Sequence, residues 1–222
     1  MFGTPDRPRS VDGHSLWPGP RRWLALGALV PRDPALLLFC PKAVPIEWWY
    51  GGELERSMGF LHVPFPGDPR LSGAVRAFGA GDAPLLFVGD LDSVAIAQYL
   101  AARSMLAAAR GPLLRYAGIN DAWRSAIAKP HRPLARLSIR MTGPERRLLR
   151  ALEAAVDLDH LVGPESAQML RDGDKVELEA GLNPGFHGAA HRQWIIAYLR
   201  AQAAAQANGQ GATPERGRRT KR

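Results

Sequence analysis

The fold is decided by residues 85–94, which read LLFVGDLDSV. Four apolar residues lead into Gly89 and the pattern Asp90-Leu-Asp92, and Ser93 then opens a strongly helical segment. A short, continuous apolar run is typical of a strand that is buried on both faces, as in a parallel sheet. Since ligands bind at the carboxyl ends of such strands, Asp90 and Asp92 are candidate site residues.

Segments of strand and helix character alternate around this stretch. We expect strands at residues 35–40, 59–64, 84–89 and 112–117, and helices at residues 46–57, 69–78, 93–109 and 119–128. The alternation predicts an α/β fold with a mainly parallel, doubly wound sheet flanked by helices. Apolar spacing in the helix at 93–109 predicts that it buries the face formed by Val94, Ala97, Ala101, Met105 and Ala108.

The second half of the chain is more helical. Thr142 and Glu145 have the spacing of a capping box, which predicts a helix from there to about residue 156. A short helix at 165–171, an alternating strand at 175–179 and a helical C-terminal extension at 186–204 follow. We therefore predict a disordered or extended N-terminal arm at 1–20, one domain at 21–204, and a basic disordered tail at 205–222.

The amino-acid composition limits the cell compartments and the classes of partner that we expect for this protein. The 222 residues include one cysteine, Cys40, which excludes a disulfide within the chain and a cysteine-based zinc site. No apolar run approaches the ~20 residues of a membrane helix, and residues 1–20 have no signal-peptide core, so we expect a cytoplasmic protein without a membrane partner. The net charge is +8, and residues 205–222 carry half of it, which favours a polyanionic partner.

The acidic residues point to metal chemistry. Two carboxylates close together repel each other, and a hard divalent cation such as Mg²⁺ relieves that repulsion. Alternatively, Asp92 only caps the helix that follows it, and Asp90 faces water. Strand alternation would place Glu177 and Glu179 on one face, either as a second carboxylate cluster near Asp90 or as the solvated face of an edge strand.

The order of an apolar strand, Asp90-Leu-Asp92 and a long helix resembles the Toprim domain. The likeness extends to Tyr116-Ala-Gly-Ile-Asn-Asp121, to residues 137–145 with the leucines after them, and to Lys175-Val-Glu-Leu-Glu179. This succession is similar to the C-terminal Toprim-like domain of the Wadjet plasmid-defence nuclease subunit and, more distantly, to the catalytic subunit of type IIB topoisomerases. It covers roughly residues 33–200.

The resemblance implies a Mg²⁺- or Mn²⁺-dependent DNA endonuclease that works with other subunits of a defence or DNA-processing system. Asp90 and Asp92 match the family's metal-binding pair, and Glu177 and Glu179 are the further candidate catalytic acids. One position departs from the pattern, because Cys40 stands where the family has a glutamate at the end of the first strand. A thiol is a poor Mg²⁺ ligand, so a degenerate, non-catalytic member of the family is the second interpretation.

Two other classes of function remain open at this level. Asp90-Leu-Asp92 also resembles the first motif of haloacid-dehalogenase-like phosphatases, in which the first aspartate is the nucleophile and the second the acid–base group. That motif usually opens its fold, whereas strand-like segments precede it here. The third class is an adaptor that carries out no chemistry and binds a partner through its basic tail.

Overall fold

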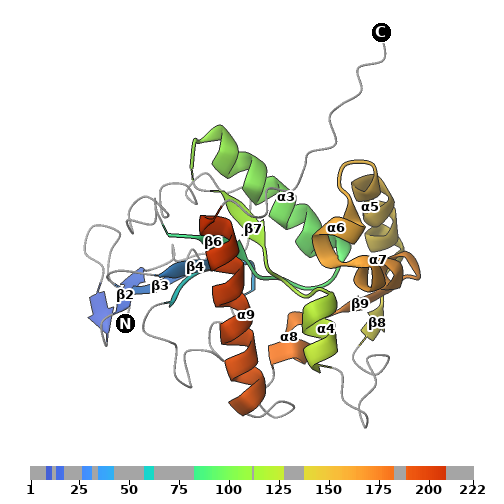
Figure 1. Cartoon of the computed structure of the whole chain (residues 1–222). Helices are drawn as coiled ribbons and strands as arrows, with labels where there is room; N and C mark the ends of the chain where they lie inside the picture. The colour runs from blue at the N-terminus through green and yellow to red at the C-terminus, as the bar shows by residue number, and fades with distance from the viewer. Residues whose placement is uncertain are drawn as a thin grey trace.

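A computed structural model describes residues 9–11, 14–17, 27–31, 35–42, 58–62, 83–111, 113–127, 138–182 and 189–208 (Figure 1). The predicted helices at 46–57 and 69–78, and residues 209–222 of the predicted tail, lie outside them. The elements are, in order, β1 Arg9–Val11, β2 His14–Trp17, β3 Gly27–Pro31, β4 Leu36–Cys40, β5 Met58–His62, β6 Leu85–Phe87, α3 Ser93–Ala108, β7 Leu114–Tyr116, α4 Asp121–Ile127, β8 Ser138–Arg140, α5 Gly143–Glu153, α6 Leu158–Val162, α7 Pro164–Arg171, β9 Asp174–Val176, α8 Leu178–Leu182 and α9 Ala189–Ala207.

A sheet with the order β1-β2-β3-β5-β4-β6-β7 forms the centre of the described structure. Its strands β5, β4, β6 and β7 are neighbours and are all parallel, which confirms the predicted parallel sheet from the segments near residues 35, 60, 85 and 113. Strands β1, β2 and β3 are antiparallel, and β3 joins the parallel part through an antiparallel pairing with β5. Part of the segment predicted as an arm is thus extended and paired in the sheet.

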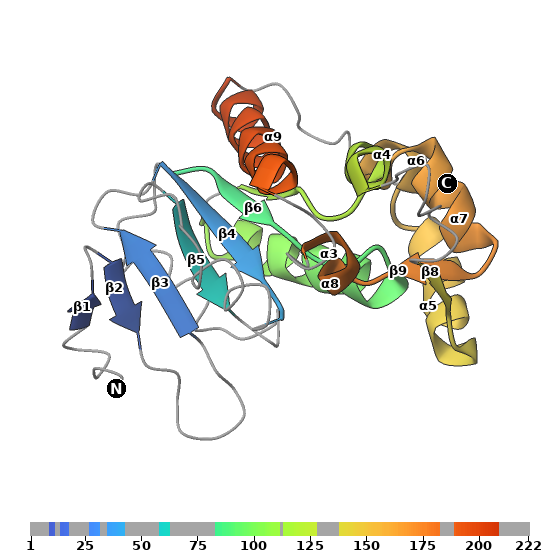
Figure 2. The ribbon, with the colours of Figure 1, turned by 90° about the horizontal axis from the view of Figure 1, so that it is seen from below.

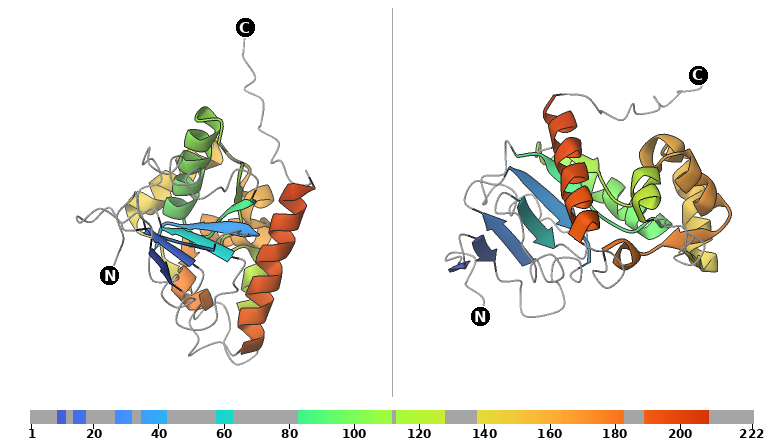
Figure 3. Two further views of the ribbon diagram at one scale, coloured as in Figure 1. Left: turned by 90° about the vertical axis from the view of Figure 1, so that its left-hand side faces the viewer. Right: turned by 60° about the horizontal axis from the view of Figure 1, so that its bottom comes forward.

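Strands β4 and β6 form the core because each of their residues is apolar and buried. Helices flank the sheet, with α3 in contact with β7 and α9 in contact with β6, and the two helices lie on different sides of it (Figures 1 and 3). Aromatic rings join the layers: Phe87 of β6 lies 5.6 Å from Tyr99 of α3 and 5.3 Å from Phe39 of β4 between ring centroids. None of the described helices is long and apolar enough to span a lipid bilayer.

The predicted buried face of α3 is wrong. Val94 is 40% exposed and Ala101 and Ala108 are also exposed. The helix instead buries Ala95, Ile96, Tyr99, Ala102 and Leu106. The physical reason is that α3 packs against both β7 and α5, and its rotation is set by the seating of Tyr99 among the core rings rather than by alanine spacing.

The remaining elements gather beside the carboxyl ends of the parallel strands. Helices α4 to α8 and the small antiparallel ladder β8–β9 lie together, away from β1 to β3 (Figure 2). The capping box of α5 is confirmed, since the Thr142 hydroxyl accepts from the Glu145 amide and the Glu145 carboxylate accepts from the Thr142 amide. The strand predicted at 175–179 ends at Val176, and Leu178 already begins α8. Helix α9 continues to Ala207, into the segment predicted as tail.

Candidate metal centre

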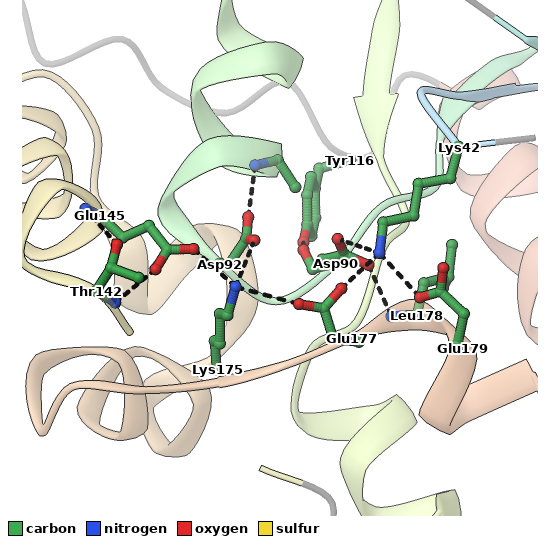
Figure 4. Close-up of polar contacts among 11 residues, drawn as sticks. Lys42, Asp90, Asp92, Tyr116, Thr142, Glu145, Lys175, Glu177, Leu178 and Glu179 are labelled. Carbon is green, nitrogen blue, oxygen red and sulfur yellow. Dashed lines mark hydrogen bonds and ion pairs between the residues drawn. The ribbon is translucent and has the colours of Figure 1, made fainter. Parts of the chain in front are cut away.

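A backbone bridge between distant segments assembles the candidate site. The Leu91 amide donates to the Val176 carbonyl (2.9 Å), and the Val176 amide donates to the Leu91 carbonyl (3.1 Å). Leu91 separates the two aspartates that follow β6, and Val176 is the last residue of β9. The bridge therefore places the acidic segment that begins with Glu177 beside Asp90 and Asp92 (Figure 4).

Asp90 is buried at the carboxyl end of the central parallel strands. Its side chain is 9% exposed, and its Oδ1 accepts from the Leu178 amide at 2.7 Å. The Tyr116 hydroxyl donates to the Asp90 main-chain carbonyl (3.2 Å) and so secures the turn. Burial raises the pKa of the Asp90 carboxyl from its usual 3.8 to about 7, because desolvation outweighs the opposing effect of Lys42. The alternative in which Asp90 faces water is therefore wrong.

Asp92 has two environments at once. It is the N-cap of α3, and its Oδ1 accepts from the Ala95 amide at 2.6 Å. Its side chain is only 6% exposed, and its Oδ2 points toward Lys175 at 3.9 Å, outside hydrogen-bond range. Burial raises its pKa, while the Ala95 amide and Lys175 act in the opposite direction. The capping role predicted as an alternative is present, and it leaves Oδ2 available to a ligand.

Lys42 lies at the centre of the acidic residues. It follows β4 by two residues, and its Nζ lies 2.8 Å from Asp90 Oδ2 and 2.9 Å from Glu179 Oε2. Glu177 Oε2 is at 2.5 Å. Partial burial alone would lower the pKa of the Lys42 amine, but Asp90 and the two glutamates raise it well above its usual value. The ammonium group is therefore charged whenever these carboxylates are.

A second lysine lies on the other side of Glu177. Lys175 Nζ is 2.7 Å from Glu145 Oε1 and 3.1 Å from Glu177 Oε1. The hydrogen bond from Lys175 lowers the pKa of Glu145 to about 2. Each oxygen of the Glu177 carboxylate thus faces a different lysine, and the pairing with Lys42 and Lys175 lowers the pKa of Glu177 despite its partial burial.

Three of these carboxylates can hold a metal ion. Asp90, Asp92 and Glu177 each offer one oxygen, and these oxygens all lie within 4.8 Å of one another. They come from the end of β6, the N-cap of α3 and the link between β9 and α8, so the tertiary structure brings together three acids that the sequence separates. A set of oxygen donors only is the kind that hard divalent cations take.

The structure therefore brings three of the four site residues predicted from the sequence into one cluster that can hold a metal ion. Glu177 joins the two aspartates, whereas Glu179, in the first turn of α8, faces Lys42 and is not part of the metal-capable triad. Neither glutamate lies on a solvated strand face, since both are about one-third exposed and paired with Lys42. The Cys40 thiol is buried at the end of β4, and burial raises its pKa to about 12. A protonated thiol supplies no metal ligand.

Sequence reasoning missed Lys42, Glu145 and Tyr116 as neighbours of the site. Lys42 carries a positional signal, because it follows the carboxyl end of β4, the strand that pairs in parallel with β6. Tyr116 ends β7, the neighbour of β6 on its other side, and carries the same signal. Glu145 was identified only as a capping residue, and its contact with Lys175 depends on the packing of α5 beside β9.

No family model matches the chain, and no curated protein sequence matches it.

Proposed function

We propose that this chain is a Toprim-like hydrolase that uses a divalent metal ion to cleave phosphodiester bonds in nucleic acid. The observation that carries the proposal is the triad of Asp90, Asp92 and Glu177 at the carboxyl end of a parallel sheet, with oxygens close enough to share one ion. Ligands of open α/β folds bind at this edge. Oxygen donors favour Mg²⁺ or Mn²⁺ over softer metals.

Each residue has a distinct part in the proposed chemistry. The three acids of the triad would hold the ion, which would stabilise charge on the phosphate and lower the pKa of a bound water. Leu178 donates its amide to Asp90 and keeps that carboxylate oriented. Glu179 faces Lys42 beside the triad and is not one of its three acids.

The charge around the site favours a polyanionic substrate. Exposed arginines lie on α5 and on the adjacent strand β8: Arg140, Arg146, Arg147 and Arg150. Helix α5 also carries Glu145, which contacts Lys175 of the site, so this basic surface begins where the metal centre ends. Phosphate groups of a nucleic acid are its natural counter-ions. The resemblance to the plasmid-defence nuclease subunit favours DNA as the substrate and a larger complex as the setting.

The test is cleavage of supercoiled plasmid in Mn²⁺. We expect the wild type to nick the plasmid, EDTA to abolish nicking, and Asp90→Asn and Glu177→Gln each to reduce its rate by about 100-fold or more, since a metal ligand is lost in each. The matched control is Glu153→Gln, an acid paired with Arg171 on the surface, which should nick as the wild type does.

Other results would reject the proposal in favour of a specific alternative. Turnover of p-nitrophenyl phosphate without nicking would indicate the phosphatase class, with Asp90 as the nucleophile. Failure to process either substrate, together with retained DNA binding, would indicate a non-catalytic binding subunit. Nicking that survives both Asp90→Asn and Glu177→Gln would show that cleavage arises elsewhere.

A further inference from the structure

Lys42 lies on the Glu179 side of the acidic cluster and contacts two members of the metal-capable triad as well as Glu179. Its ammonium group contacts one oxygen each of Asp90, Glu177 and Glu179, at 2.5 to 2.9 Å. These oxygens come from the end of β6, the link after β9 and the first turn of α8. Three carboxylates from separate segments around one positive charge are the surroundings of a bound cation, and here the chain supplies that cation itself.

Lys175, the second lysine of the cluster, does not contact the Asp92 carboxylate as closely as Lys42 contacts its partners. Lys175 is closest to Glu145, at 2.7 Å, and stays 3.9 Å from Asp92 Oδ2. Among the residues that the structure describes, no ammonium group therefore reaches Asp92 Oδ2 within hydrogen-bond distance. Lys175 thus lies on the Asp92 side of the cluster and holds Asp92 only loosely, whereas Lys42 lies on the Glu179 side and contacts its carboxylates closely (Figure 4).

The balance of charges in the cluster favours one divalent ion in addition to the two lysines. In the described part of the chain, the cluster contains two ammonium groups and five carboxylates, those of Asp90, Asp92, Glu145, Glu177 and Glu179. One divalent ion nearly neutralises the remaining excess of negative charge. Enzymes that use two metal ions place them about 3.5–4 Å apart, to stabilise the attacking and the leaving oxygen together, and a fixed ammonium group on one side can provide part of that charge.

We propose that Lys42 is the built-in second cation of this centre, so that the protein binds one divalent ion between Asp90, Asp92 and Glu177 and uses the Lys42 ammonium group where a second ion would otherwise bind. The inference rests on the proposed function, and it names the cation requirement of the same site. The three N–H groups of Lys42 face the three carboxylates, so what the ammonium group offers a nearby phosphate oxygen is its positive charge.

Metal stoichiometry tests the inference without any measurement of cleavage. Titration of the full-length chain with Mn²⁺, followed by calorimetry and by the electron paramagnetic resonance signal of free Mn²⁺, should give one ion per wild-type chain. Lys42→Met keeps most of the side-chain length but removes the charge. Asp90, Glu177 and Glu179 then lose this cation, although Glu177 keeps its contact with Lys175, and a second Mn²⁺ should bind at least about tenfold more tightly than any second ion in the wild type.

Two variants serve as controls. Lys42→Arg keeps the positive charge and should bind one Mn²⁺. Arg171→Met removes a cation that pairs with Glu153 and Asp159 at the surface and should also bind one. In plasmid nicking, Lys42→Met should lose about 100-fold in rate at Mn²⁺ concentrations that fill only the first site, and Lys42→Arg should restore part of that loss.

The outcomes separate this inference from the proposed function. One ion in the wild type and two in Lys42→Met support the role of Lys42, even if no variant nicks DNA, in which case the proposed function alone fails. Two ions in the wild type would overturn the inference, and this measurement stands even if Lys42→Met does not fold. An unchanged single ion in folded Lys42→Met, or no ion in the wild type, would overturn it as well.

Discussion

Asp92 joins two functions that substitution can separate. Its Oδ1 caps α3 through the Ala95 amide at 2.6 Å. Within the described part of the chain, no ammonium group lies within hydrogen-bond distance of its Oδ2, and Asp92 belongs to the metal-capable triad. Asn keeps a side-chain oxygen for the cap but loses the charge. Ala loses both. A comparison of the two variants therefore separates the structural from the functional contribution of one residue.

The magnitudes follow from the geometry. Replacing an N-cap aspartate by alanine costs about 1–2 kcal/mol, and in a chain of this size each kcal/mol lowers the melting temperature by roughly 2–4 °C. We expect Asp92→Ala to melt about 2–8 °C below the wild type in the absence of metal. Asp92→Asn should melt within about 2 °C of the wild type, since it keeps the cap and removes a charge that burial disfavours.

The affinity for Mn²⁺ should not distinguish the two Asp92 variants as the melting temperature does. Both variants lack a carboxylate ligand, so both should bind Mn²⁺ at least about tenfold more weakly than the wild type in calorimetry. Asp157 offers the matched control, because it caps α6 through the His160 amide at 3.2 Å and is not part of the triad. Asp157→Ala should lower the melting temperature and leave Mn²⁺ affinity unchanged. Wild-type Mn²⁺ affinity in Asp92→Asn would refute the assignment of Asp92 as a ligand.

Three further predictions concern stability. In the metal-free protein, the pKa of Asp90 in the folded state (about 7) lies above its usual 3.8, so between these pH values the folded state retains a proton that the unfolded state has lost. The free energy of unfolding of the wild type, measured relative to that of Asp90→Asn, should therefore fall as the pH rises from about 4 to about 7. A constant difference between the two proteins in denaturant unfolding across that range would contradict this. Thr142→Ala removes the hydroxyl of the α5 capping box and should cost about 1 kcal/mol in urea unfolding, whereas a neutral result would mean that the box adds nothing. Gly118→Ala would place its Cβ 2.7 Å from the Gly89 carbonyl oxygen and should cost about 1–3 kcal/mol, while Gly143→Ala, whose nearest atom is at 3.6 Å, should be close to neutral by the same assay.

The local part of the fold could be read from the residues themselves. The apolar run at 36–40 predicts a strand buried on both faces, and every described residue of β4 is buried. The capping box at Thr142 was identified correctly because it depends on residues three apart in the chain. The alternation of strands and helices also predicts the parallel pairing, because a helix between two neighbouring strands returns the chain so that the second strand runs in the same direction as the first.

The rotation of α3 and the extent of β9 could not be obtained in this way. Small alanines have similar preferences for the inside and the outside of a protein, so their spacing did not show that Tyr99 sets the buried face. The alternation at 175–179 fits a strand, but the Asp90 carboxylate accepts from the Leu178 amide, an interaction that a continuing strand would not offer. A contact between residues more than eighty positions apart in the chain decided the local structure there.

The sequence by itself determined that two aspartates stand at the carboxyl edge of a parallel sheet, because this follows from the strand that precedes them and the helix that they open. Only the tertiary structure decided which acid joins them and which cation opposes them. Glu177 reaches the aspartates through the bridge between Leu91 and Val176, and Lys42 arrives from β4, forty-eight residues before Asp90. Electrostatic interactions act through space, so the partners of a charge depend on how the strands are ordered and not on distance along the chain.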